Sequence, residues 1–188
     1  MVAGRGILEE CFLSSYVVDK GGYPYLVNPV SDGVPAVTKE LLDDIVDRFV
    51  DVCDFECDYI LAPEAMGIHL ATAVCMRTGI PFVVIRKRKY GLPGEVALKK
   101  KTGYGDSTMY VNGIGEGDRV VLLDDVISTG GTTRSIIEAI EKTGADVVGV
   151  VTVFNKSRDI KALEETVGKP IRSILNIGVL DGRPVVYP

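Results

Sequence analysis

Two adjacent carboxylates, Asp124 and Asp125, end an aliphatic run in residues 119–135, RVVLLDDVISTGGTTRS, and a segment rich in serine, threonine and glycine follows them. Glycines let successive backbone N–H groups turn toward one point, and the N-terminus of a following helix adds a partial positive charge. Hydroxyl groups supply further hydrogen-bond donors. The stretch therefore predicts a phosphate-binding loop made of Ser128, Thr129, Gly130, Gly131 and Thr132. It is neither a P-loop nor a dinucleotide fingerprint, because GxxxxGK[ST] and GxGxxG are both absent there.

The two carboxylates would repel a bound phosphate unless they face another group. Each can accept hydrogen bonds from the vicinal hydroxyls of a ribose, and a hydrated Mg²⁺ is compatible with the same site. The stretch thus favours a ribose 5-phosphate as ligand, with the phosphate in the loop and the sugar diol on Asp124 and Asp125. The alternative is a polar strand-to-helix turn that carries two solvated aspartates.

Composition excludes several other classes of protein. The chain has 188 residues, of which 46% are hydrophobic and 25% charged, as expected for one soluble globular domain. A net charge of −5 argues against nucleic-acid binding through a basic surface. No apolar run reaches the length of a membrane span or signal peptide. Four cysteines without a metal-ligand pattern and a single histidine, His69, argue against a zinc site and favour a reducing, cytoplasmic setting.

From residue 38 onward, helix-like and strand-like segments alternate. Thr38 is a predicted N-cap, and apolar residues at helical spacing follow it. The predicted strands are 58–63, 81–88, 107–112, 119–125, 145–156 and 171–179, and the further predicted helices are 67–79, 132–144 and 158–167. This alternation predicts an α/β fold with a parallel, doubly wound sheet, whose ligands bind at the carboxyl ends of the strands. The first 35 or so residues do not follow the alternation and are expected to form a small cap.

Three predicted strands lead into segments that could do chemistry: APEAMG (62–67), RKRKYG (86–91) and DDVISTGGT (124–132). We expect them to meet at one edge of the sheet. Residues 89–107 are rich in glycine and lysine and have the length of a lid over that edge. Glu64 is a candidate for binding Mg²⁺ through water, or simply a carboxylate at a helix N-terminus. His69 is expected to be a packing or surface residue rather than a catalyst.

These segments also carry a family resemblance. VVLLDDVISTGGT (120–132) resembles the 5-phosphoribosyl-1-pyrophosphate (PRPP) signature of the type I phosphoribosyltransferases. APEAMGIHLA (62–71) resembles their pyrophosphate loop, and RKRKYGLPG (86–94) resembles the segment that leads into the lid of adenine and xanthine phosphoribosyltransferases. The whole chain is most similar to the archaeal hypoxanthine/guanine phosphoribosyltransferase group, where PYLVNPVSDGVP (24–35) matches as well.

The resemblance implies a single type I phosphoribosyltransferase domain over residues 1–188, with an N-terminal hood at about 1–37 and a mobile lid at about 89–107. It implies purine salvage, in which PRPP and hypoxanthine or guanine give IMP or GMP and pyrophosphate. Mg²⁺ would be bound mainly through PRPP, with no protein metal ligands, and the enzyme would be a cytoplasmic homodimer that binds neither nucleic acid nor membrane. The alternatives are adenine or xanthine as the base, and a non-catalytic regulator with the same fold that senses PRPP or nucleotides.

The resemblance also implies roles for individual residues. The implied positions are Asp124 and Asp125 on the ribose hydroxyls, Ser128, Thr129, Gly130, Gly131 and Thr132 on the 5-phosphate, Ala65, Met66, Gly67, Arg86 and Lys87 on the pyrophosphate, Glu95 and Tyr104 in the lid, and Val30, Ser31 and Asp32 in the hood near the base. The chain departs from relatives at three positions. Adenine enzymes usually carry Arg at the position of Met66 and an acidic residue at that of Gly103, and eukaryotic hypoxanthine/guanine enzymes carry Asp at that of Ser128. Glu95 is the remaining candidate for a proton acceptor.

Overall fold

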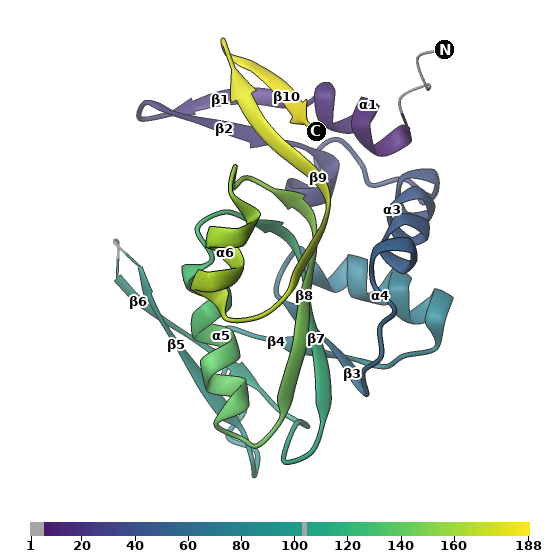
Figure 1. Ribbon diagram of the computed structural model, residues 1–188. Coiled ribbons are helices and arrows are strands. Elements are labelled where there is room, and N and C mark those ends of the chain that lie inside the picture. Colours follow the sequence, from purple (N-terminus) through teal and green to yellow (C-terminus); the bar gives the residue numbers. More distant parts are fainter. Residues whose placement is uncertain (1–5, 103–104) are drawn as a thin grey trace.

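The computed structural model describes residues 6–102 and 105–188 (Figure 1). Its helices are α1 (Ile7–Leu13), α2 (Pro29–Asp32), α3 (Lys39–Val52), α4 (Gly67–Thr78), α5 (Gly131–Glu141) and α6 (Ile160–Val167). Its strands are β1 (Tyr16–Lys20), β2 (Tyr23–Val27), β3 (Tyr59–Pro63), β4 (Phe82–Ile85), β5 (Val96–Thr102), β6 (Gly105–Val111), β7 (Arg119–Ile127), β8 (Asp146–Asn155), β9 (Ile171–Leu180) and β10 (Arg183–Tyr187).

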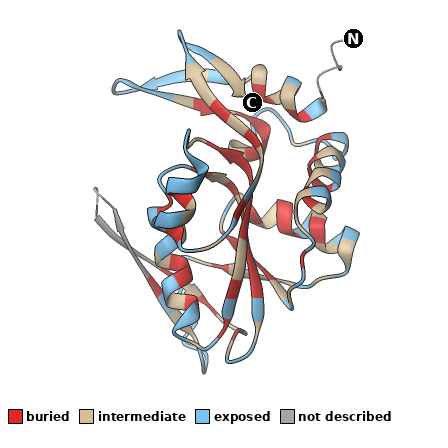
Figure 2. Ribbon diagram, in the orientation of Figure 1, coloured by how far each residue is buried: buried red, intermediate tan, exposed pale blue. Residues whose placement is uncertain are grey.

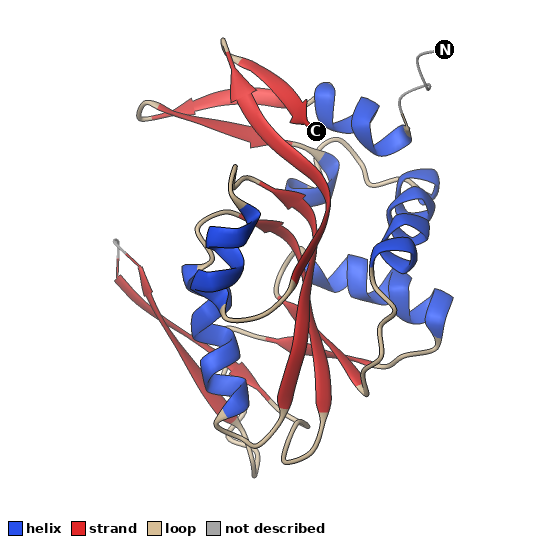
Figure 3. Cartoon of the chain, in the orientation of Figure 1, coloured by secondary structure: helices blue, strands red, loops and turns tan. Residues whose placement is uncertain are grey.

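Six strands form the central sheet in the order β10-β9-β8-β7-β3-β4. All neighbours in it are parallel except β10, which runs antiparallel to β9. Helices α3 and α4 cover one face and α5 and α6 the other (Figure 3). Side chains alternate between the faces of a strand, so β7 sends Val121 and Leu123 into the α3–α4 core and Val120 and Leu122 into the α5 core. The predicted α/β class and mostly parallel sheet are confirmed.

Two hairpins lie outside the central sheet. Strands β1 and β2 pair with each other, as do β5 and β6, and neither pair joins the central ladder. The β5–β6 hairpin lies along α5 (Figure 1). A backbone bridge between Arg86 and Tyr110 ties β6 to the segment just after β4, with N···O distances of 2.8 and 2.6 Å. Figure 2 shows that burial is concentrated in the central strands and the helix faces against them, while the β1–β2 hairpin is largely exposed.

Most predicted elements from residue 38 to 180 occur close to their predicted bounds, and Thr38 does cap α3 by accepting from the Leu41 amide. Three differences matter for the site. The predicted strand 107–112 is part of β6, which pairs with β5 and not with the central sheet. The predicted strand 81–88 ends at Ile85, where the chain passes into the Arg86 bridge. Finally, β7 continues to Ile127, so the two aspartates lie within the strand and not at its end, where the predicted strand 119–125 places them.

The predicted hood segment contains α1, the β1–β2 hairpin and α2, and the C-terminal strand β10 lies against α1. Arg48 on α3 fixes α1 through two hydrogen bonds to Glu9, at 2.6 and 2.7 Å. The Leu8 amide adds a bond to Asp44 of α3 at 2.9 Å. The N-terminal cap is therefore attached to the body by specific polar contacts as well as by the buried Leu8 and Phe12.

Candidate functional site

The order of the strands places the candidate loops together. After β3 the chain moves outward to β4, and it then returns to the other side of β3 to form β7. The carboxyl ends of β3 and β7 therefore flank a topological switch point, where open α/β sheets bind their ligands. Residues 64–66 follow β3 and residues 128–130 follow β7, so both loops open onto this point.

The loop after β7 has the features expected of an anion cradle. Ser128 and Thr129 are exposed, and Gly130 takes a left-handed φ of +75° immediately before α5 begins. No side chain caps this N-terminus, and the uncapped backbone N–H groups of a helix start favour an anion. The structure thus brings Ser128 through Thr132 to one edge of the switch point.

Gly130 is also fixed by packing. A Cβ added there would lie 2.8 Å from Val167 Cγ2 and 2.9 Å from Leu163 Cδ1, both on α6. Such distances are shorter than real Cβ contacts, so α6 supports the loop from behind, and a side chain at position 130 would force Val167 or Leu163 to move.

The two aspartates emerge on opposite faces of β7. Asp125 is in phase with Val121 and Leu123 and is 9% exposed, on the face covered by α3 and α4. Asp124 is in phase with Leu122, on the α5 face, and its carboxylate accepts the amide of Asp125 at 2.9 Å. A ligand at the end of β7 would therefore meet the two carboxylates from two sides and not as a parallel pair.

Asp125 lies within electrostatic reach of two residues from other elements. Burial, a hydrogen bond to Asp32 and the charges of Asp32 and Asp125 raise the pKa of Tyr25 to about 12, so its phenol stays protonated. Burial lowers the pKa of His69, while the charge of Asp125 partly opposes that shift. Asp125 thus sits between β2 of the hood and the first turn of α4.

The loop after β3 lies beside the end of β4. The Glu64 carboxylate accepts the Lys87 amide at 2.8 Å and lies 3.9 Å from a guanidinium nitrogen of Arg86. Glu64 therefore orders the predicted pyrophosphate-binding residues. Ala65 is exposed and Met66 half-buried, and the Glu64–Ala65 peptide is cis.

Gly67 begins α4 in close contact with the sheet. A Cβ on it would lie 3.0 Å from the Leu123 carbonyl oxygen, so α4 starts directly against β7. The structure brings Ala65, Met66, Gly67, Arg86 and Lys87 together at the switch point.

One of the three predicted hood residues, Val30, differs from the prediction. The Val30 side chain is 0% exposed, packed in the core beneath α2, and it cannot contact a base from there. The Ser31 amide donates to the Asn28 side chain at 3.0 Å, which caps α2. The Asp32 carboxylate accepts from the Tyr25 hydroxyl at 2.9 Å and the Asn28 amide at 3.1 Å. These groups hold the hood together, and Asp32 orients the half-buried side chain of Tyr25.

Of the two predicted lid residues, Glu95 is not brought to the site. The Glu95 carboxylate accepts the amides of Tyr90 and Gly91 and a bond from Asn112, and these bonds lower its pKa although desolvation opposes them. It lines a cavity with Glu138 and Lys142 near the C-terminal end of α5. The phosphate loop is at the other end of this helix, about 16 Å away at 1.5 Å per residue. Tyr104 lies outside the described residues.

Three residues that the sequence analysis did not select converge near Asp125. The Lys20 ammonium lies 3.6 Å from the centre of the Tyr25 ring, and that of Lys156 lies 6.0 Å from it. The Lys156 amide donates to the Ile127 carbonyl at 2.8 Å, directly beside the end of β7. Lys156 ends the predicted strand 145–156 and directly follows β8, so the rule that selected the other three loops could also have selected this position.

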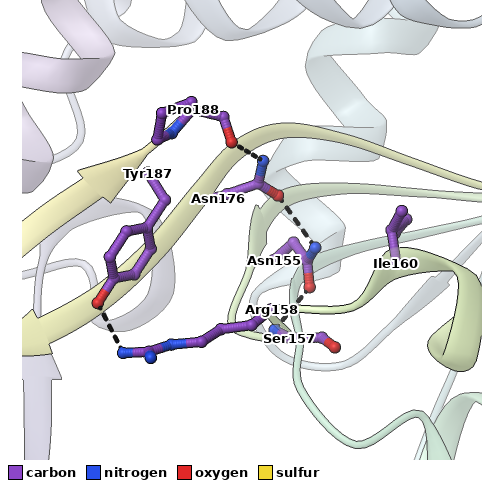
Figure 4. Close-up of a pocket in the computed structure, with 7 residues that line it drawn as sticks. All are labelled: Asn155, Ser157, Arg158, Ile160, Asn176, Tyr187 and Pro188. Carbon is purple, nitrogen blue, oxygen red and sulfur yellow. Dashed lines mark hydrogen bonds between the residues drawn. The ribbon is translucent and has the colours of Figure 1, made fainter.

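A cavity of about 400 Å³ opens beyond Lys156, at the carboxyl end of β8 and beside Asn176 in β9 (Figure 4). Its lining includes a ladder of amides: Asn155 donates to Asn176 at 3.0 Å, and Asn176 donates to the Pro188 carbonyl at 3.1 Å. Arg158 donates to the Tyr187 hydroxyl at 3.1 Å on the other side of the cavity. Hydrogen-bonding groups and the apolar Ile160 thus line a space next to the switch point.

Within residues 6–102 and 105–188, no three His, Cys, Asp or Glu side chains come together as a metal site. None of the described helices is long and apolar enough to cross a membrane.

Known proteins resemble this chain over nearly its full length. Residues 36–178 match the phosphoribosyl transferase domain family. An HGPRTase-like protein of Halobacterium salinarum is 50% identical over 180 residues, which cover 95% of each chain. A hypoxanthine/guanine phosphoribosyltransferase of Methanothermobacter thermautotrophicus is 47% identical over 176 residues, covering 94% of this chain and 91% of that protein. The solved adenine phosphoribosyltransferase of Thermoanaerobacter pseudethanolicus matches with a TM-score of 0.74 at 22% identity, covering 90% of this chain and 99% of that one, a likeness of fold alone.

Proposed function

Because this chain belongs to the phosphoribosyl transferase family, we propose that it transfers the 5-phosphoribosyl group of PRPP to hypoxanthine or guanine, giving IMP or GMP and pyrophosphate. The expected type I fold agrees with the family match and the solved structures. The observation that carries the choice of base is the 46–48% identity to archaeal relatives named hypoxanthine/guanine phosphoribosyltransferase.

In this proposal the loop Ser128–Thr132 binds the 5-phosphate of PRPP. Its backbone N–H groups and hydroxyls converge at the uncapped start of α5. Asp124 and Asp125 accept the ribose hydroxyls from the two faces of β7 and fix the sugar relative to the incoming base.

The pyrophosphate lies against the backbone of Ala65, Met66 and Gly67, with Arg86 and Lys87 neutralising its charge. Mg²⁺ would enter this site bound mainly through PRPP. When bound, it would stabilise the negative charge of the leaving pyrophosphate.

The purine lies between the hood and the carboxyl ends of β7 and β8. Tyr25 offers an aromatic face there, and Lys156 offers a donor that suits a 6-oxo group. The cavity of Figure 4 begins at Asn155, one residue before Lys156, and extends this region.

The chain would act mainly through positioning and charge. Holding base and sugar in line replaces a bimolecular encounter, and fixed N–H groups and cations stabilise the departing anion. We further propose that residues 1–188 work as one domain, that 1–37 serve as the hood and 89–107 as a lid that excludes water, and that the enzyme is a homodimer.

The test is a PRPP- and Mg²⁺-dependent assay run with hypoxanthine, guanine, adenine and xanthine, with nucleotides separated by chromatography. IMP and GMP with little AMP is the expected result. AMP or XMP alone would retain the transfer reaction but overturn the choice of base. No product, together with measurable nucleotide binding, would favour a regulator.

A double substitution tests the site itself. Asp124→Asn with Asp125→Asn should lower turnover by a factor on the order of 10² or more, because the ribose loses both charged acceptors. Circular dichroism should show a folded protein. Asp47→Asn, an exposed carboxylate on α3, is the matched control and should retain activity. Normal turnover in the folded double variant would contradict the assignment.

A further inference from the structure

His69 leaves a polar atom unsatisfied next to the proposed ribose site. It is the single histidine of the chain and lies in the first turn of α4. Its Nε2 atom is buried and has no hydrogen-bond partner among the described residues. Folded proteins rarely leave a buried polar atom unpaired, so the atom calls for a partner that another state of the site supplies.

The neighbour that can supply it is Asp125. Helix α4 begins in contact with β7, since a Cβ on Gly67 would lie 3.0 Å from the Leu123 carbonyl oxygen. Leu123 and Asp125 share the face of β7 that α4 covers, and Asp125 is the next residue along that face. Among the described residues, the Asp125 carboxylate is the charged group whose field acts on His69.

The imidazole is suited to act as a donor at this position. Burial keeps the pKa of His69 below its ordinary value, so the ring is neutral at neutral pH and can carry its proton on Nε2. A carboxylate has about four acceptor positions, so it can receive one bond from an imidazole while it receives others from a sugar.

We propose that His69 is a positioning residue of the ribose site, whose Nε2–H donates to the Asp125 carboxylate when that carboxylate binds the sugar hydroxyls. The inference rests on the proposed function, because it takes Asp125 as a ribose ligand. His69 then acts through Asp125 by restricting its rotation and does not itself touch the substrate.

Three substitutions separate this role from packing. His69→Gln keeps a side-chain N–H near the Nε2 position, His69→Asn moves it to the Nδ1 position, and His69→Leu removes it. The dissociation constant of ribose 5-phosphate, measured by calorimetry, should rise about tenfold in the Leu and Asn variants and less than about threefold in the Gln variant. Thr72→Leu, one turn further on the exposed side of α4, is the control and should match the wild type.

A mutant cycle with Asp125→Ala tests the pairing. His69→Leu should have little further effect on ribose 5-phosphate binding once the acceptor oxygens of Asp125 are gone. Equal losses in the Gln and Leu variants, or additive losses in the double variant, would overturn the proposal.

Nuclear magnetic resonance gives a readout that does not depend on turnover. With ¹⁵N-labelled histidine the signal belongs to His69 alone, because the chain has one histidine. Saturating ribose 5-phosphate should produce a slowly exchanging Nε2–H resonance, which inorganic phosphate should not produce and Asp125→Ala should abolish. An unchanged signal, or no binding of ribose 5-phosphate, would overturn the inference. Failure of the proposed function would appear separately, as the absence of nucleotide product with every base.

Discussion

The packing of α6 behind the phosphate loop makes Gly130→Ala the most informative single substitution for the fold of the site. The alanine would hold an L side chain at a φ of +75° and push its Cβ to 2.8 Å from Val167 and 2.9 Å from Leu163. Holding an L residue in this left-handed conformation costs about 1–2 kcal/mol of folding free energy. Overpacking of a filled core adds about 1–3 kcal/mol. The free energy of unfolding should therefore fall by about 2–5 kcal/mol.

Gly168→Ala separates the cost of the backbone conformation from the cost of steric overpacking. Gly168 ends α6 with a φ of +79°, but nothing lies within 4 Å of the added Cβ. It should lose only the conformational part, about 1–2 kcal/mol. Urea unfolding of both variants gives the steric part as the difference between them.

A second substitution tests whether Val167 is the side chain with which the added Cβ collides. Val167→Ala should be destabilising alone, yet it should recover part of the loss when it is combined with Gly130→Ala, because it removes the nearest clashing atom. Equal stability of Gly130→Ala and Gly168→Ala, or strict additivity with Val167→Ala, would refute the view that α6 dictates glycine in the loop.

Three further predictions concern groups around the site and the hood. Arg48→Ala should lower the free energy of unfolding by about 1 kcal/mol at pH 7, by loss of the partly exposed pairs with Glu9 and Asp44. The hydrogen bond from Arg48 lowers the pKa of Glu9 from its ordinary 4.5. This stabilisation should therefore be lost as the pH falls from about 4.5 through the lowered pKa of Glu9. Urea unfolding of the wild type and of Arg48→Ala should then give the same stability. Burial raises the pKa of the Cys57 thiol to about 11 from an ordinary 9.0. At pH 8, iodoacetamide should therefore modify Cys57 about a hundredfold more slowly than a free thiol, as followed by mass spectrometry. Alkylation at the rate of a free thiol would contradict its burial. Tyr25→Phe keeps the ring but loses the hydrogen bond to Asp32, so KM for the purine should rise several-fold while KM for PRPP changes little. Tyr23→Phe, at an exposed tyrosine, is the control. A selective rise in KM for PRPP would place Tyr25 away from the purine.

The sequence was a good guide where local pattern and tertiary structure agree. The aliphatic runs of β3, β7 and β8 are buried on both faces, so their composition alone identified them as central parallel strands. The Ser/Thr/Gly segment after β7 predicted a strand-to-helix turn because glycines allow a tight turn and hydroxyl side chains supply donors before a helix.

The hairpins escaped prediction for a physical reason. Strands β1 and β2 are largely exposed, and β5 includes the run Lys99–Lys101, so neither offers a continuous apolar run. Their stability comes from pairing with a partner strand and from packing of a few residues such as Leu26 and Leu98.

The site was predictable in its backbone but less so in its side chains. Val30 was selected as a residue near the base, yet the turn of α2 points it into the core, and the half-buried Tyr25, five residues earlier, is the hood side chain closest to Lys156 in the described contacts. The opposite orientation of Asp124 and Asp125 follows from β7 extending two residues past them, which the sequence does not mark.

The Arg86–Tyr110 bridge has a mechanical consequence. Apart from this pair, the described strands of the β5–β6 hairpin share no ladder with the central sheet, and side-chain packing of Leu98, Met109 and Val111 against the α5 core holds the rest of the hairpin. The backbone of Arg86, whose side chain is proposed to hold the leaving pyrophosphate, is thus a hydrogen-bonded joint between hairpin and sheet. In the proposed enzyme, a movement of the hairpin would be transmitted to this cation, so the rates of lid opening and pyrophosphate release should be coupled.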